Sequence, residues 1–208
     1  MKKMQRILSA FLVMLTLVML LGVLPETVHA ASIKAPTVSI SNDADTGKVV
    51  LSWGKVSGAA KYEIYRATSK TGTYSRQSST TSTTYTNTSA EVGIQYYYKV
   101  RAVAKDGSYA NSKIVSRTCD LPRPVVSLDN STVGKIKISW DAIDGAVKYK
   151  VYRSTDGETW TLLKNTADTK LTNAGLTSGT AYYYKVLAIA SVSSANSAYS
   201  EAVSITAG

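Results

Sequence analysis

The sequence predicts an all-β protein built of two tandem sandwiches, on the basis of three observations. One pattern is written twice, 86–87 residues apart: Ser52-Trp53 and Tyr96-Tyr97-Tyr98-Lys99-Val100 return as Ser139-Trp140 and Tyr182-Tyr183-Tyr184-Lys185-Val186. A repeat of this length corresponds to a whole domain rather than to a solenoid unit. After the first 30 residues no segment keeps a helical period, whereas short alternating runs separated by Gly, Asn, Asp, Ser and Thr recur, as is typical of β-sandwiches.

The strands are read from the alternation of apolar and polar residues within each copy. In residues 135–140, Ile136, Ile138 and Trp140 share one face, and the residues between them share the other. The side chains expected to point inward are Val49, Leu51, Trp53, Tyr62, Ile64, Tyr96, Tyr98, Val100 and Ala102 in the first copy, and Ile136, Ile138, Trp140, Tyr149, Val151, Tyr182, Tyr184, Val186 and Ala188 in the second.

These residues resemble the fibronectin type III family, twice over. Trp140, Tyr149-Lys150-Val151 and the run from Leu176 to Tyr182 follow the family pattern, while the first copy departs from it at Ala90 and Ile94. The resemblance implies immunoglobulin-like sandwiches of seven strands in two sheets, without a disulfide. It also implies that Tyr96 and Tyr182 are corner tyrosines, whose hydroxyls bond to upstream backbone. The expected domains are residues 36–119 and 124–208, joined by a short proline-containing linker at 120–123 that we expect to be semi-rigid.

The first 30 residues predict a secretory signal peptide. Lys2, Lys3 and Arg6 precede an apolar run from Ile7 to Leu24, and Val28-His29-Ala30 supplies small residues for cleavage. The alternative is an uncleaved membrane anchor, although a run of about 18 residues is near the lower limit for spanning a bilayer. The sequence therefore indicates a secreted protein, extracellular or associated with the cell surface.

Charge limits the classes of partner. Removal of residues 1–30 takes three of the 24 basic and one of the 14 acidic residues, which leaves a net charge of +8. Such a charge favours anionic wall polymers, other polysaccharides or another protein as partners. The basic residues follow alternate strand positions and form no groove, so no nucleic acid is expected. A membrane would be reached only through an uncleaved leader.

Nothing in the sequence predicts catalysis, a metal site or a cofactor. His29, the one histidine, lies in the leader, and Cys119 is the one cysteine. The carboxylates are scattered singly along turns, whereas a glycosidase holds two of them about 5–10 Å apart in a cleft. We expect a protein that is not an enzyme. Cys119 is expected to be a buried thiol, the alternative being an exposed thiol that forms an intermolecular disulfide.

Aromatic residues are the remaining candidates for ligand contact. Alternation places Tyr65 and Tyr97 on the outer face of adjacent strands in the first copy, and Tyr152 and Tyr183 in the second. Trp160 follows a turn of the second copy. Such rings stack on sugars or anchor protein interfaces. The alternative is that cross-strand tyrosine pairs stabilise their own sheet, with lysine stems covering the rings.

Three functions remain open from the sequence. The first is a non-catalytic spacer or adhesive module made of two fibronectin type III-like domains. The second is a module that binds polysaccharide or cell-wall polymer through its exposed tyrosines. The third is the N-terminal accessory part of a larger carbohydrate-active enzyme.

Overall fold

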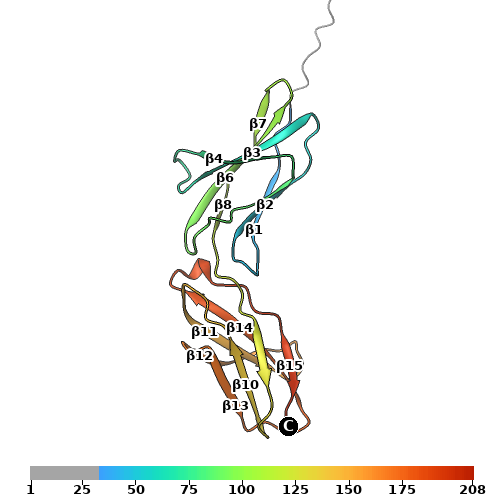
Figure 1. Ribbon diagram of the computed structural model, residues 1–208, viewed down its shortest axis with the longest axis vertical. Helices are drawn as coiled ribbons and strands as arrows, with labels where there is room; N and C mark the ends of the chain where they lie inside the picture. The colour runs from blue at the N-terminus through green and yellow to red at the C-terminus, as the bar shows by residue number, and fades with distance from the viewer. Residues whose placement is uncertain (1–32) are drawn as a thin grey trace, which may run out of the picture. The chain divides into compact units, whose positions relative to one another are not determined.

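The computed structural model describes residues 33–208, so the predicted signal peptide lies outside the described residues (Figure 1). Residues 33–119 form two sheets, here called the first sandwich. The smaller sheet has the order β1-β2-β5 and the larger one β4-β3-β6-β7, with β8 also paired to β6. The strands are β1 (Val38–Asn42), β2 (Val49–Trp53), β3 (Ala59–Ala67), β4 (Ser75–Thr80), β5 (Thr84–Thr86), β6 (Gln95–Ala104), β7 (Tyr109–Asn111) and β8 (Val115–Thr118).

Residues 124–208 form two more sheets, here called the second sandwich. Their orders are β13-β10-β9 and β12-β11-β14-β15. The strands are β9 (Val126–Asp129), β10 (Lys135–Trp140), β11 (Ala146–Ser154), β12 (Thr161–Thr166), β13 (Lys170–Ala174), β14 (Ala181–Ala190) and β15 (Val203–Thr206), with the short 3-10 helix η2 (Ser193–Ala195) before β15. Within residues 33–208, no helix is long and apolar enough to cross a membrane.

The predicted all-β class is confirmed, and the strand count differs in one place. Seven strands were expected in each sandwich, and the second has seven, whereas the first has eight. The extra strand arises because β7 and β8 pair with successive parts of β6. Between β7 and β8, the Ser112 hydroxyl accepts a hydrogen bond from the Val100 N–H at 3.0 Å. In a continuous strand pair, a backbone carbonyl would accept this bond. A side chain thus bridges the break in what is otherwise one long strand.

Each sandwich closes over its own hydrophobic core, and every side chain predicted to point inward is buried. Buried residues alternate with less buried ones from Gln95 to Val103 in β6 and throughout β14: Tyr98 and Tyr184 are fully buried, as are the valines two residues later. Burial of an aromatic or branched side chain stabilises a fold by about 1.5–3 kcal/mol. The two cores are therefore built from the same residue types at the same strand positions.

Buried tyrosine hydroxyls fix the loops in both sandwiches. The hydroxyl of Tyr96 accepts the N–H of Glu91 at 3.1 Å, and that of Tyr182 accepts the N–H of Thr177 at 3.2 Å. These bonds to upstream backbone confirm the predicted corner tyrosines. Deeper in the first core, Asn87 donates to the Tyr98 hydroxyl at 2.7 Å, and burial raises the pKa of Tyr98 to about 12.

The segment at the end of the first sandwich is well bonded. Cys119 is fully buried, as predicted, and burial raises the pKa of its thiol. In the expected linker, the N–H of Asp120 donates to Gly47, that of Leu121 to Ala195 and that of Arg123 to Ala44. Since Pro122 has no N–H, every backbone donor of residues 120–123 is satisfied.

Candidate functional site

The outer face of the larger sheet of the first sandwich carries a ladder of aromatic rings and cations. Register places Tyr65 of β3 opposite Lys99 of β6. Lys99 Nζ lies 5.5 Å from the ring centroid of Tyr65 and 5.0 Å from that of Tyr74. The Arg101 guanidinium lies 4.7 Å from Tyr65 and 4.1 Å from Tyr109. Cation–π contacts of this kind contribute about 0.5–1 kcal/mol each at exposed sites.

One buried carboxylate, Glu63, lies among the cations of this face. Its side chain is 9% exposed, and its oxygens lie 3.1 Å from Lys61 Nζ, 3.1 Å from Arg76 Nη1 and 3.7 Å from Arg101 Nη1. The Tyr65 hydroxyl also donates to it at 2.9 Å. Burial opposes ionisation of Glu63, but the hydrogen bonds from Tyr65 and Lys61 outweigh that effect, so its pKa is lowered from its usual value. One carboxylate thus binds three of the cations on this face.

The second sandwich has a related ladder on its larger sheet. Tyr152 of β11 lies opposite Lys185 of β14, and Lys185 Nζ is 4.1 Å from the Trp160 ring and 4.5 Å from the Tyr199 ring. Tyr152 and Tyr199 meet edge to face, with centroids 5.5 Å apart. A hydrogen bond with Tyr152, followed by burial, raises the pKa of Tyr199.

The position equivalent to Glu63 in the second sandwich is Lys150. Glu63 lies opposite Arg101 in the β3–β6 register, and Lys150 lies opposite Leu187 in the β11–β14 register. The strands of this sheet carry Lys148, Lys150, Arg153, Lys164 and Lys185 but no aspartate or glutamate. Among residues 33–208, none of these five cations lies within 4.0 Å of a carboxylate oxygen.

The sequence-predicted aromatic residues all lie on these outer faces and are half-buried: Tyr65, Tyr97, Tyr152, Tyr183 and Trp160. The expected cross-strand tyrosine pairs are wrong in register, because Lys99 rather than Tyr97 is opposite Tyr65. Lysine stems covering the rings were predicted, and Lys99 and Lys185 do approach ring faces. The rings are thus partly engaged with cations of the same sheet.

Residues that the sequence interpretation overlooked complete these faces. They include Glu63, Arg101, Tyr109 and Tyr199. The sequence did contain a signal for Glu63. Lys61-x-Glu63 aligns with Lys148-x-Lys150, so the two copies differ in charge at this position. Tyr199 carried no such signal, since it lies outside a regular strand and its backbone pairs with β14 through an isolated bridge to Leu187.

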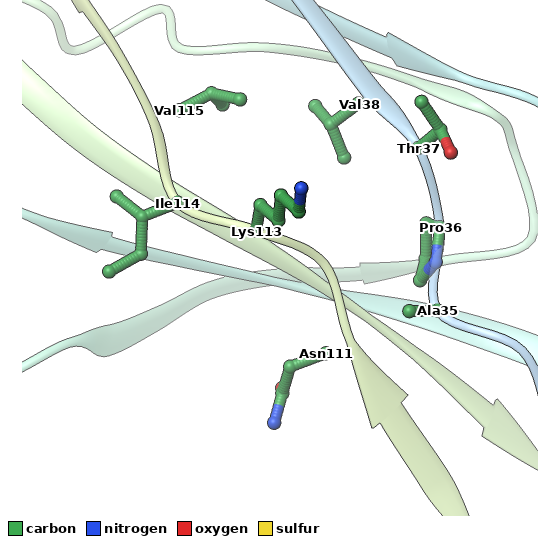
Figure 2. A pocket seen from close by; sticks show the side chains of 8 residues that line it. All are labelled: Ala35, Pro36, Thr37, Val38, Asn111, Lys113, Ile114 and Val115. Carbon is green, nitrogen blue, oxygen red and sulfur yellow. The ribbon is translucent and has the colours of Figure 1, made fainter.

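A groove of about 450 Å³ lies beside β1 in the first sandwich. It is lined by residues 35–38 and by residues 111 and 113–115, and Figure 2 shows the Lys113 side chain between these two segments. Ile114, on its rim, is 43% exposed. The lining contains no carboxylate, histidine or thiol, and Lys113 is its one charged side chain. Residues 33–208 also contain no group of three or more potential metal ligands.

Comparison with known proteins supports a fibronectin type III fold. The family described as the PBP1-like, fibronectin3-like domain matches residues 129–198. The structure of the chicken interferon gamma receptor alpha chain superposes with a TM-score of 0.58 at 15% identity, over 84% of this chain and 98% of that one. This likeness concerns the fold alone.

Two curated relatives are polysaccharide-degrading enzymes by name. An amylopullulanase of Thermoanaerobacter thermohydrosulfuricus is 42% identical over 74 residues, which are 35% of this chain and 5% of the relative. Exoglucanase B of Cellulomonas fimi is 29% identical over 197 residues, which are 88% of this chain and 16% of the relative. The chain therefore spans less than a fifth of the length of either enzyme.

Proposed function

We propose that this chain is a non-catalytic, extracellular spacer or adhesive module of a system that acts on polysaccharides. The observation that carries the proposal is the small share of each enzyme that the chain matches, 5% and 16%. The matched segments, of 74 and 197 residues, have the lengths of one and of two small domains within much longer enzymes.

The proposal includes the domain plan predicted from the sequence. A signal peptide at 1–30 directs secretion, residues 36–119 and 124–208 are two tandem fibronectin type III-like domains, and residues 120–123 connect them. Two separate hydrophobic cores support this plan. N-terminal sequencing of the secreted chain tests the leader, because cleavage after Ala30 gives a mature chain that begins at Ala31.

The test of the module uses purified residues 31–208, which contain both cores. We expect no release of reducing sugar from starch or cellulose, and retention on at least one insoluble polysaccharide or cell-wall preparation. Hydrolysis by the purified protein contradicts the proposal. Absence of retention on every surface removes the adhesive role and leaves the spacer role.

The second candidate is polysaccharide binding through the exposed tyrosines, and the half-buried rings of both outer faces favour it. Tyr152→Ala combined with Tyr183→Ala tests it in the second sandwich. Loss of retention on a neutral polysaccharide, with little change in the melting temperature, supports this site. Unchanged retention shows that the tyrosines are not the contact residues.

A further inference from the structure

The outer face of the second sandwich's larger sheet brings cations and apolar groups together. We call it the lysine–aromatic face; it consists of Lys148, Lys150, Tyr152, Trp160, Leu162, Lys185, Leu187 and Tyr199. It spans the neighbouring strands β12, β11 and β14 (Figure 1). Register places Leu162 and Lys185 on either side of Tyr152, and Leu187 beside Lys150.

The cations of this face have no counter-charge of their own. Lys185 Nζ lies 4.5 Å from the centroid of the Tyr199 ring, and Lys150 lies two residues before Tyr152, whose ring meets Tyr199 edge to face. No acidic residue lies on β11, β12, β14 or β15. On the first sandwich the same position is Glu63, which binds three cations within 4 Å. The strands of both larger sheets carry a net charge of +5, so the repeats differ not in total charge but in the carboxylate that the first places among its cations.

The apolar part of the face is accessible to a partner. Tyr199 is 44% exposed and Leu162 is 42% exposed, and both adjoin Tyr152. Aromatic and aliphatic side chains pack against the C–H faces of sugar rings, while ammonium groups donate hydrogen bonds to carboxylates. A polymer with sugar rings and carboxylates matches both properties. A neutral glucan would offer the lysines no carboxylate.

We propose that the lysine–aromatic face binds an acidic polysaccharide whose sugars carry carboxylates. The inference rests on the proposed function, since it names the substrate class of the adhesive module. Lys148, Lys150 and Lys185 contact the carboxylates, and Tyr199 and Leu162 pack against the rings. Because these charges lie at the protein surface, the binding weakens as salt shortens the screening length from about 10 Å at 0.1 M to about 3 Å at 1 M.

The test measures binding of residues 31–208 to soluble polygalacturonate at low salt, by calorimetry. Lys150→Glu gives the second sandwich the charge that the first has at this position, and we expect affinity to fall by about tenfold or more. Lys148→Glu is the second variant. Because Lys148 is exposed, this variant still tests the face if Lys150→Glu fails to fold. Circular dichroism verifies that both variants keep the wild-type fold.

The matched control is Lys135→Glu, which changes the net charge equally but lies exposed on β10, in the other sheet. Affinity within about twofold of wild type is expected for it, since its charge lies away from the proposed face. Equal losses for Lys135→Glu and Lys150→Glu overturn the inference, because binding then follows net charge alone. Tighter binding to polyphosphate than to polygalacturonate also overturns it, because the sugar rings then contribute nothing.

Failure of this inference is distinguishable from failure of the proposed function. If wild-type protein ignores polygalacturonate but remains on insoluble neutral polysaccharide, the inference is wrong and the adhesive module stands. If the protein hydrolyses starch or cellulose, the proposed function is wrong, whatever the polygalacturonate result.

Discussion

Glu63 in the first sandwich and Lys150 in the second occupy the same place on the middle strand of the larger sheet, yet they give opposite surfaces. Around Glu63, three cations are bound by one carboxylate. Around Lys150, a leucine replaces the arginine on the neighbouring strand, and no carboxylate is present on the sheet. The first face is an internal ion-pair network, and the second is a set of cations beside apolar groups.

Inside the two sandwiches, by contrast, the buried polar contacts are the same. Asn87 donates to the hydroxyl of Tyr98, and Asn173 donates to that of Tyr184 at 2.9 Å. The N–H of Val100 is accepted by a serine hydroxyl, and so is the N–H of Val186, each at 3.0 Å. The fold therefore dictates the buried polar contacts, while the outer faces are free to differ in chemistry. Differences between the repeats are accordingly the best guide to function.

The largest expected difference between the sandwiches concerns a glycine at the same turn of each. Gly47 and Gly134 both have φ of +68°. A Cβ on Gly47 would lie 2.0 Å from the carbonyl oxygen of Asp120, whereas one on Gly134 has its nearest neighbour at 3.8 Å. We expect Gly134→Ala to cost about 1 kcal/mol through backbone strain alone, and Gly47→Ala to cost about 3 kcal/mol or more.

Hydrogen exchange, resolved by peptide, measures these two variants in the intact chain. Protection should fall in β2 for Gly47→Ala far more than in β10 for Gly134→Ala. Equal losses in the two sandwiches would show that the contact between Gly47 and Asp120 carries no stability.

The next largest effect is expected from Glu63. Glu63→Gln leaves three cations around a side chain without charge, and removal of a buried ion-pair partner is strongly destabilising. We expect the free energy of unfolding of the first sandwich to fall by about 2 kcal/mol. Lys150→Gln is the matched control at the equivalent position, with an expected change below about 0.5 kcal/mol. Exchange in β3 and β11 measures both, and a larger effect for Lys150→Gln would contradict the assignment of the two faces.

The same carboxylate should make the first sandwich more sensitive to acid. Since the pKa of Glu63 is lowered by folding, its contribution is present above the unfolded value of about 4.3 and is lost as pH falls through the folded pKa. Turn aspartates with lowered pKa occur in both sandwiches, Asp43 and Asp106 in the first and Asp129 and Asp156 in the second. Asp120 acts in the opposite direction, because burial raises its pKa.

The comparison that isolates Glu63 is therefore wild type against Glu63→Gln. Melting temperatures between pH 7 and pH 3 should show a gap that is wide at neutral pH and closes toward pH 3. A gap of constant width would mean that the charge of Glu63 contributes nothing, and that the substitution acts through packing alone.

The fold and the cores were largely predictable from the sequence, whereas the site was predictable only in part. Alternation along a strand has a period of two, so Tyr96, Tyr98 and Val100 could be assigned to one face without coordinates. The outer position of Tyr65 followed from the same rule. Its partner did not, because the register between β3 and β6 places Lys99 opposite Tyr65, and register depends on turn geometry as well as pattern.

Other features depend on contacts that alternation does not encode. Tyr109 and Tyr199 reach their ladders from β7 and from an irregular segment, and both meet cations of the neighbouring long strand. The close approach of Gly47 to Asp120 joins residues more than 70 positions apart. Such pairings are set by the closure of the sandwich, so a single sequence gives no local signal for them.

The smallest expected effect concerns Cys119, for which the second sandwich already supplies the substitution. The N–H of Gly93 donates to the Cys119 carbonyl at 2.9 Å, and the N–H of Gly179 donates to the Ala207 carbonyl at the same distance. Ala207, which is also buried, is therefore the equivalent of Cys119 in the second sandwich. Cys119→Ala removes one sulfur atom from the core, and we expect it to cost about 1 kcal/mol or less. Because the thiol is fully buried and its pKa is raised, wild-type protein should react with a thiol reagent only after unfolding. Rapid labelling of the folded protein would instead show that the end of β8 opens in solution, and that the thiol is accessible to a second chain.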